Sequence, residues 1–357
     1  MKVLLVAGAS GGHIFPALAL ASHLQSRGCE TLLVIPRKNS VTAGALQGVP
    51  VAMISVEAVR PRVRPDTLRA VARFVRGCWE SMRVVNGFSP DVAVGFGSIA
   101  SIPVMLLCWL FRIRTVLHEQ NVTPGKANRF LAGFCDRICV SFAESRDYFS
   151  SGRGRITVTG NPLRARLKIL PRGQALSFFS FKEGRSTILV MGGSQGSARV
   201  NRASISALSS AVEPEAIQVI HICGKDNAEA VRIEYARLRI EARVFDFLEE
   251  MEYAFSCADL VVCRAGATTV TELEFFRVPA VILPYPYASA HQLQNARVLK
   301  ECGAALIIED ADIEGGALAR GLNDLLDHRE RLAGMRASYG SPPERTAVEE
   351  LARVVLD

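Results

Sequence analysis

The sequence predicts an α/β protein made of two Rossmann-like domains, each a parallel sheet covered by helices on both sides. Short apolar runs rich in β-branched residues alternate with segments of helical periodicity along the 357 residues, which is the pattern of repeated βαβ units. The pattern starts twice, because a glycine turn follows an apolar strand at residues 8–13 and again at residues 192–197. We therefore expect a seam near residues 160–164 (GNPLR), while the final helix, 341–357, can pack on either domain.

The first domain is expected to begin with the strand KVLLVA (2–7), which leads through the first glycine turn into a helix. One face of that helix is apolar, and Gly28 ends it. Each following β-rich run is preceded or followed by a helical segment, so the strands are expected to be parallel. These further strands are expected at residues 31–36, 91–96, 115–120 and 137–142.

The second domain is expected to begin with the strand STILVM (186–191) and its glycine turn. A third glycine turn, at 266–269, follows another apolar run. In open parallel sheets, ligands bind at the carboxyl ends of the strands, where helix starts offer free N–H groups and a favourable dipole to phosphates. None of the three turns continues as a P-loop. The remaining strands of this domain are expected at 218–223, 242–247, 258–263 and 280–285.

Composition and charge limit the classes of protein that the chain fits. Hydrophobic residues make up 49%, too many for a disordered chain. The net charge of +7 favours an anionic partner, although a merely basic surface explains it as well. Nine cysteines without a disulfide-like spacing indicate reduced thiols and an intracellular protein. The longest apolar stretch, 102–111, is about half the length that spans a bilayer, so we expect no membrane-spanning segment.

The segment CRAGATTVTELEFF (263–276) has a strand end, a glycine turn and a helix start in succession. Arg264 is placed to supply positive charge to phosphates bound at the turn. Glu272 lies one turn into the helix and is placed to accept hydrogen bonds from ribose hydroxyls. The alternative, which this segment taken alone favours, is a surface glutamate near a helix start.

Two further polar clusters follow expected strands. HEQN (118–121) places Glu119 and Asn121 at a strand end, which indicates a cleft because buried polar groups need partners. HQLQNA (291–296) offers amide side chains, such as that of Gln292, to sugar hydroxyls, or simply begins a polar helix.

His13 stands at the end of the first glycine turn. Its ordinary pKa near ~6.5 makes the neutral imidazole a suitable proton acceptor at cellular pH. Two alternatives remain open at this point. His13 caps the turn by a hydrogen bond, or Glu119 is the base instead.

Residues 61–85 predict a two-faced helix from about Asp66 onwards, with an apolar stripe opposite an arginine stripe. A basic amphipathic helix can lie on an anionic membrane, and Trp79 at its border favours this interpretation. The alternative is a packed helix with its arginines in water. Nucleic acid is not expected as a partner, because no reading motif or aromatic interleaving appears. The expected membrane contacts are Arg69, Arg73, Arg76 and Trp79.

Single features of the sequence also fit three other hypotheses. Tandem Rossmann-like domains can bind NADP, with Arg37 and Lys38 receiving the 2′-phosphate, but GASGGH lacks the GxGxxG spacing. Asp310 and Asp312 form a DxD triplet of the kind that holds a metal ion, but helix capping explains it better. A lipid-binding scaffold without catalysis is the third. We expect no metal and no other cofactor.

Six motifs in order resemble the MurG family of glycosyltransferases: GASGGHIFPAL, HEQNxxPGKANR, GNPLR, GGSQGSxxxN, CRAGATTVTE and HQLQNA. The resemblance covers essentially the whole chain. It implies the inverting transfer of N-acetylglucosamine from UDP-N-acetylglucosamine to lipid I, undecaprenyl-pyrophosphoryl-muramyl-pentapeptide. The product is lipid II, for peptidoglycan and the cell wall. A protein of this kind is peripheral, at the cytoplasmic face of the bacterial inner membrane.

The resemblance also implies the GT-B fold, two Rossmann-like domains facing across a cleft, with the last helix returning to the first. The alternative function that stays open is that of another GT-B glycosyltransferase, one that transfers a sugar to a different membrane lipid such as diacylglycerol. The first domain, 1–160 with 341–357, is expected to bind the acceptor and the membrane, and the second, 161–340, the donor. His13 is the favoured base and Glu119 the second choice. The acceptor residues implied are Gly11, Gly12, His13, Gly95, Gly97 and Ser98. The donor residues implied are Ser10, Gly11, Gly12, Asn121, Arg164, Ser194, Leu248, Arg264, Ala267, Thr269, Glu272, His291 and Gln292.

Overall fold

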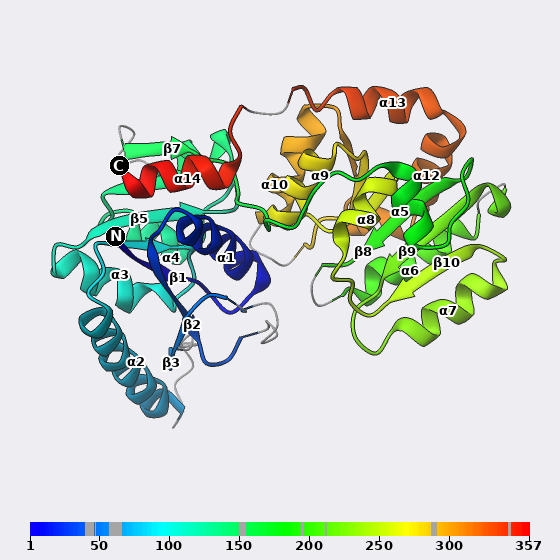
Figure 1. Cartoon of the computed structure of the whole chain (residues 1–357). Helices are drawn as coiled ribbons and strands as arrows, with labels where there is room; N and C mark the ends of the chain where they lie inside the picture. The colour runs from blue at the N-terminus through cyan, green and yellow to red at the C-terminus, as the bar shows by residue number, and fades with distance from the viewer. Residues whose placement is uncertain are drawn as a thin grey trace. The chain divides into compact units, whose positions relative to one another are not determined.

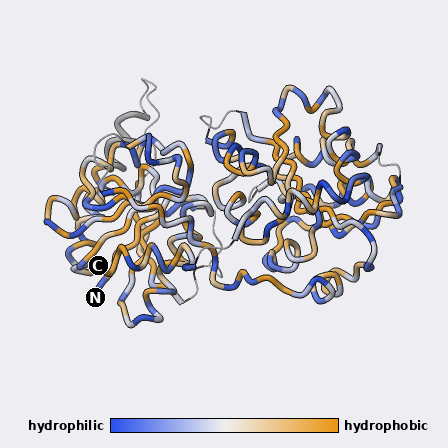
Figure 2. Tube along the Cα trace, turned by 90° about the horizontal axis from the view of Figure 1, so that it is seen from above, coloured by the Kyte–Doolittle hydropathy of each residue, from blue (hydrophilic) through white to orange (hydrophobic). Residues whose placement is uncertain are grey.

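The computed structural model describes residues 1–39, 46, 48–56, 66–149, 155–193, 196–210, 213–286, 291–341 and 344–357, without the side chains of 66–74. The chain forms two compact units, Met1–Ala165 with Pro343–Asp357 and Arg166–Pro342. Each unit is a parallel sheet with helices on both faces (Figure 1). Two Rossmann-like sheets in tandem were predicted, and this fold class is confirmed. Hydrophobic segments concentrate in the interior of each unit (Figure 2).

Unit 1 contains a seven-stranded sheet in the order β3-β2-β1-β4-β5-β6-β7. All its neighbouring strands run parallel; Leu4, for example, lies opposite Leu32 of β2 and Ala93 of β4. The chain leaves β1 toward one edge and returns through β4 to build the other, so a ligand crevice is expected at the carboxyl ends of these two strands. The strands are β1 (Lys2–Val6), β2 (Glu30–Pro36), β3 (Val51–Ile54), β4 (Val92–Gly95), β5 (Arg114–Glu119), β6 (Arg137–Val140) and β7 (Ile156–Val158).

The helices of unit 1 cover two apolar cores, one on each face of the sheet. Successive residues of a strand point to opposite faces, so Leu5 joins the core under α1 and α14 while Leu4 joins the core under α3 and α4. The helices are α1 (Gly11–Ser26), α2 (Asp66–Phe88), α3 (Ser101–Leu110), α4 (Lys126–Leu131), the 3₁₀ helix η2 (Ala143–Tyr148) and α14 (Ala347–Leu356).

Unit 2 contains a six-stranded parallel sheet in the order β10-β9-β8-β11-β12-β13, which again reverses direction beside its first strand. The strands are β8 (Ser186–Met191), β9 (Ile217–Ile222), β10 (Glu241–Phe245), β11 (Leu260–Cys263), β12 (Ala280–Ile282) and β13 (Ala305–Ile307). The helices are α5 (Arg172–Phe178), α6 (Ala198–Leu208), α7 (Ala228–Arg237), α8 (Met251–Cys257), α9 (Ala267–Phe276), α10 (His291–Glu301), α11 (Asp310–Ile313), α12 (Ala317–Asp327) and α13 (Arg329–Ala337), with the 3₁₀ helix η4 (Pro214–Ala216).

The final helix, α14, packs on α1 of unit 1, where Figure 1 shows the two side by side in red and blue. Thr346 begins it with a capping box, in which Thr346 and Glu349 bond each other's backbone N–H groups. Leu351 and Val355 enter the core beneath α1. Arg114 of β5 donates to the carbonyl oxygens of Val354 (2.7 Å) and Val355 (3.2 Å) at the other end of the helix.

Among the described residues, no helix combines the length and the apolar character needed to cross a bilayer.

We predict that Arg114→Ala lowers the free energy of unfolding of unit 1 by about 1.5–3 kcal/mol, because a charged donor to two carbonyl oxygens is lost. Urea unfolding measures the change. Arg353→Ala is the control, since Arg353 forms only surface ion pairs with Glu350 and Asp357, worth at most about 1 kcal/mol. Equal losses in the two variants would contradict the anchoring role of Arg114.

Candidate functional site

The start of α9 has the properties of an anion site. Gly266 is its N-cap, no side chain caps it, and no acidic residue lies in its first turn. The first intrahelical bond runs from Val270 N to Gly266 O, so the N–H groups of the preceding turn point beyond the helix end. The buried Thr268 Oγ1 lies beside them without a hydrogen-bond partner in the described structure. Such a helix start favours a phosphate.

Arg264 fastens the loops around this turn. Its buried guanidinium donates to Leu283 O (2.8 Å) and Pro284 O (3.2 Å) after β12, and to Ser197 Oγ (3.3 Å) before α6. It also bonds Asp310 Oδ1 at 3.4 Å. The sequence predicts direct contact between Arg264 and phosphates. In the structure its hydrogen bonds go to protein groups, so its described role is to hold three loops together.

The HQLQNA motif at the start of α10 clamps the same turn from the other side. Gln292 Oε1 accepts from Ala265 N (3.2 Å) and from Tyr285 N (2.9 Å). The buried Asn295 donates through Nδ2 to Ala265 O (3.1 Å). Ala265 is therefore held by both of its backbone groups. Asn295 was not among the predicted site residues, although its position within the HQLQNA motif could have indicated a role at this turn.

Glu272 is buried on α9, so the interpretation of this residue as a surface glutamate is wrong. Ala267 and Thr269 are also buried, in the first turn of the helix. His291, at the start of α10, is half-buried.

The turn between β8 and α6 admits only glycine at two positions. A Cβ on Gly192 would lie 2.4 Å from Ser197 N. Gly196 has a φ of +72°, and a Cβ there would lie 2.5 Å from Cys223 O. Ser197 then caps α6 by accepting from Val200 N at 3.3 Å. Ser194, a predicted donor residue, lies outside the described residues.

In unit 1, two turns at the carboxyl ends of β1 and β4 pack against each other. A Cβ on Gly8 would lie 2.5 Å from Ser98 Cβ and 2.9 Å from His13 Nδ1. Gly97 and Ser98 both have left-handed backbones, with φ of +89° and +79°. The start of α1, like that of α9, has neither a side-chain cap nor an acidic residue in its first turn. The predicted residues Ser10, Gly11, Gly12 and Gly95 belong to these two turns.

His13 lies at this junction, with Nδ1 2.9 Å from Ser10 Oγ. Burial by surrounding protein atoms lowers the pKa of His13 to about 4, although the residue keeps some exposed surface. The imidazole is therefore neutral at cellular pH. If Nδ1–H donates to Ser10, Nε2 is the atom that remains to accept a proton.

Glu119 is buried at the end of β5 and accepts four hydrogen bonds. Oε1 accepts from Asn121 N (2.9 Å) and Asn121 Nδ2 (3.2 Å), and Oε2 from Gly125 N (3.1 Å) and Asn128 Nδ2 (2.8 Å). A carboxylate saturated in this way holds a loop rather than taking a proton from a substrate. These bonds favour a structural role for Glu119 over the role of base, and they fix Asn121.

Comparison with known proteins agrees with this arrangement over nearly the whole chain. The N-terminal and C-terminal domains of glycosyltransferase family 28 match residues 3–140 and 187–351. Proteins of Halothermothrix orenii and Coxiella burnetii are 35% and 36% identical, and each alignment covers 98% of this chain and 98% or 96% of the relative. Both are named UDP-N-acetylglucosamine--N-acetylmuramyl-(pentapeptide) pyrophosphoryl-undecaprenol N-acetylglucosamine transferase.

The chain belongs to the MurG family. The crystal structure of Acinetobacter baumannii MurG superposes with a TM-score of 0.77 at 27% identity, over 100% of this chain and 99% of that one. The UDP-N-acetylglucosamine 2-epimerase of Neisseria meningitidis, 13% identical with a TM-score of 0.69 over 100% and 98%, shares the fold alone. The GT-B fold predicted from the motifs is thereby confirmed for this MurG-family protein.

Two further predicted donor residues of this MurG-family chain lie in different units. The Arg164 guanidinium lies over the ring of Phe15 on α1, 5.1 Å from its centroid. Leu248 is buried between β10 and α8, where only its backbone is suited to polar contacts.

Of the two residues that the NADP hypothesis assigns to the 2′-phosphate, Arg37 and Lys38, the structure engages the first. Arg37 donates to Ser55 Oγ (3.0 Å) and Glu80 Oε1 (3.2 Å), which engage its guanidinium within the protein. The DxD triplet also has protein partners, because the Asp310 carboxylate pairs with Arg199 Nε (2.9 Å) and with Arg264. No group of three or more possible metal ligands occurs among the described residues. In this MurG-family protein, the guanidinium of Arg37 is thus engaged within the protein instead of being open to a 2′-phosphate. The carboxylate of Asp310 is likewise engaged instead of being open to a metal ion.

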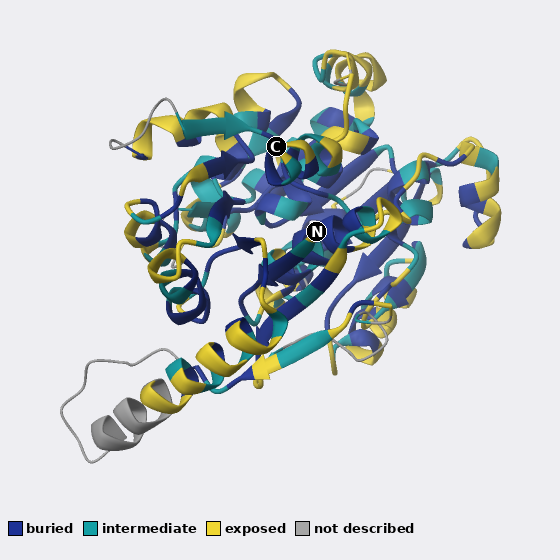
Figure 3. Ribbon diagram, turned by 60° about the vertical axis from the view of Figure 1, so that its left-hand side comes forward, coloured by how far each residue is buried: buried dark blue, intermediate teal, exposed yellow. Residues whose placement is uncertain are grey.

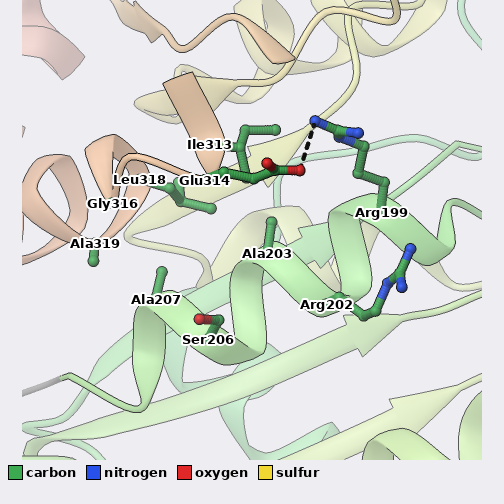
Figure 4. A pocket seen from close by; sticks show the side chains of 10 residues that line it. All are labelled: Arg199, Arg202, Ala203, Ser206, Ala207, Ile313, Glu314, Gly316, Leu318 and Ala319. Carbon is green, nitrogen blue, oxygen red and sulfur yellow. Dashed lines mark ion pairs between the residues drawn. The ribbon is translucent and has the colours of Figure 1, made fainter. Parts of the chain in front are cut away.

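A hollow of about 340 Å³ lies between α6 and the turn that joins α11 to α12 (Figure 4). Arg199, Ser206 and Leu318 are among its lining residues, and Arg199 pairs with Glu314 at 3.8 Å. One wall of the hollow follows α6 from Arg199 to Ala207.

We predict that Glu119→Gln lowers the free energy of unfolding by about 2–3 kcal/mol, because an amide NH₂ then faces N–H donors and the charge is lost. Urea unfolding measures it, with the exposed Glu144→Gln as control. If Glu119→Gln unfolds like the wild type, these four hydrogen bonds do not organise the loop.

Proposed function

We propose that the chain transfers N-acetylglucosamine from UDP-N-acetylglucosamine to the 4-hydroxyl of the muramyl sugar of lipid I, with inversion, to give lipid II. The relatives' names give this donor and this acceptor. The observation in this chain that carries the proposal is the α9 turn, whose open N–H groups are held in place by Arg264 and Gln292. Such a rigid, uncapped helix start suits a diphosphate.

The donor is assigned to unit 2. Its diphosphate binds at Ala267 and Thr269, and the ribose bonds the carboxylate of Glu272. Uracil meets the backbone of Leu248, and the sugar meets Gln292, whose Nε2 is not used by the bonds that clamp the turn. The remaining donor contacts of the proposal are Ser194, His291, Arg164 and Asn121, with Ser10, Gly11 and Gly12.

The acceptor is assigned to unit 1, with its diphosphate at the start of α1 and at the turn of Gly95, Gly97 and Ser98. His13 takes the proton of the muramyl 4-hydroxyl as that oxygen bonds to the anomeric carbon. The bond from the anomeric carbon to UDP breaks at the same time, and UDP leaves with the electron pair. Glu119 supports this side by fixing its loop.

A membrane-contacting face is assigned to α2 and the end of α3, which pack together. Val75, Trp79 and Met82 are exposed on α2. Figure 3 shows exposed segments, in yellow, along the described turns of this helix. Arg83 lies over the Trp79 ring at 4.7 Å, while Arg76 pairs with Glu80 at 3.1 Å. Aromatic and basic side chains together suit the surface of an anionic bilayer. Trp109, Leu110, Phe111 and Phe130 are also exposed.

The side chains of Arg69 and Arg73, also predicted as membrane contacts, lie outside the described part. The proposal places the protein at the cytoplasmic face of the bacterial inner membrane, where both substrates meet.

We predict that the purified chain incorporates labelled N-acetylglucosamine from UDP-N-acetylglucosamine into a lipid I analogue, and that His13→Ala lowers kcat by roughly 10²–10⁴-fold. The affinity for UDP is expected to stay near the wild-type value, because His13 lies outside unit 2. Absence of transfer by the wild type, with the analogue in micelles or vesicles, would overturn the proposed function.

The pH dependence of the transfer reaction tests the same role of His13. Because burial depresses the pKa of His13 to about 4, the basic form persists as pH falls and is lost only near that value. The kcat/KM of the wild type, which reports the pKa values of the free protein, is therefore expected to stay level down to about pH 5, whereas an imidazole of ordinary pKa would lose activity below about 6.5. A fall near the ordinary value would exclude the depressed pKa.

We predict that Trp79→Ala combined with Arg83→Glu weakens binding to vesicles of phosphatidylglycerol and phosphatidylcholine by at least roughly fivefold. Arg237→Glu, on the exposed surface of α7 in unit 2, makes the same charge change and is expected to have little effect. Vesicle co-sedimentation measures both. Vesicle binding that does not depend on the anionic lipid content would contradict membrane contact by α2. An equal loss of binding in Arg237→Glu would contradict it as well.

A further inference from the structure

A buried chain of hydrogen bonds connects the interior of unit 2 with the glycine turn before α6. His221, on β9, has no exposed surface. Its Nδ1 lies 2.9 Å from the hydroxyl of Tyr235 on α7, and its Nε2 lies 3.1 Å from Asn201 Oδ1 on α6. Asn201 in turn donates through Nδ2 to Cys223 O at 2.9 Å, just beyond the end of β9.

The direction of each bond in this chain is fixed. Asn201 must present Nδ2 to Cys223, because the reversed amide would place two oxygens against each other. Its Oδ1 therefore accepts, and His221 Nε2 carries the proton. Burial lowers the pKa of His221 to about 4, so Nδ1 carries no proton at cellular pH and accepts from the hydroxyl of Tyr235. The ring is neutral and held in one tautomer, with both nitrogens satisfied.

One end of the chain reaches the turn that precedes α6. Asn201 lies in the first turns of the helix, and its N–H bonds Ser197 O at 2.9 Å. Asn201 also bonds Cys223 O, and Gly196 packs directly on this carbonyl group, since a Cβ on Gly196 would lie 2.5 Å from Cys223 O. Ser197 also bonds Arg264, which fastens the α9 turn. A displacement of Asn201 would therefore move the turn relative to the carboxyl edge of the sheet.

We propose that His221 is a positioning residue for donor binding. By holding Asn201 on Cys223, it sets the position of Gly196, Ser197 and the start of α6. Through the bond between Ser197 and Arg264, it thereby positions the α9 turn that receives the diphosphate of the donor. His221 does not touch the donor, and it acts through Asn201 alone. The inference rests on the proposed function, which supplies the nature of the ligand.

The same strand offers a matched control. Gln218 of β9 is also fully buried, and it makes three hydrogen bonds at the opposite, amino end of the sheet. It accepts from Lys182 N (3.2 Å) and donates to Lys182 O (3.0 Å) and Thr187 Oγ1 (2.9 Å). Its loss disturbs the interior of the unit to a similar degree, without any link to the glycine turn.

The test compares His221→Phe, Asn201→Ala and Gln218→Met in the full chain. Thermal unfolding, kcat, KM for UDP-N-acetylglucosamine and the Kd of UDP are measured for each. We expect all three to lower Tm, but only His221→Phe and Asn201→Ala to raise the donor KM and the Kd of UDP, by at least roughly fivefold, with kcat changed less. The double variant is expected to go no further than the larger single effect, because both changes break one path.

A donor KM for His221→Phe at the wild-type value, or one raised equally by Gln218→Met, would overturn the inference. If His221→Phe does not fold, the donor KM and the Kd of UDP are compared between Asn201→Ala and Gln218→Met, and the same criteria apply. A wild type that neither binds UDP nor transfers the sugar would instead contradict the proposed function, so the two failures are distinguishable.

Discussion

A helix start receives a phosphate only if its first N–H groups stay unpaired while the loops around them stay fixed, and both units are built around this constraint. No side chain caps α1 or α9, and neither has a carboxylate in its first turn. Open ends of this kind cost stability unless solvent or a ligand satisfies them. The loops must therefore be held rigid by side chains that bond the neighbouring backbone and do not bond the N–H groups of the helix start.

The two units meet this need with buried charges of opposite sign. In unit 1 the Glu119 carboxylate gathers N–H donors from its own loop, and in unit 2 the Arg264 guanidinium gathers carbonyl oxygens from others. A buried charge is tolerated only when its hydrogen-bonding capacity is filled. Each charge thus holds its loops in place, and in the proposed reaction the neutral His13 is the group that meets the substrate.

Local sequence predicts the elements well and the division of roles poorly. The glycine turns and long apolar strands were predictable because their signals lie within a few residues. β3, β7 and β13 were missed. All three are short strands at an edge of their sheet, whereas the equally short interior strand β12 was predicted within the longer run 280–285. The clamp by Gln292 and Asn295, and the capture of Arg37 by Glu80, join segments far apart in sequence, so no spacing rule finds them. The low pKa of His13 likewise arises from burial, which the sequence does not express.

These bonds also indicate what stabilises a departing diphosphate in the proposed reaction. The charge of Arg264 is shared with Asp310, which pairs with Arg199 as well, so little of it is left for a ligand. The start of α9 carries roughly half a positive charge that no carboxylate offsets. At about 4 Å and an effective dielectric constant near 20, half a charge stabilises a unit negative charge by about 2 kcal/mol. That is roughly 30-fold in rate. The backbone, more than the arginine, is therefore expected to stabilise the leaving group.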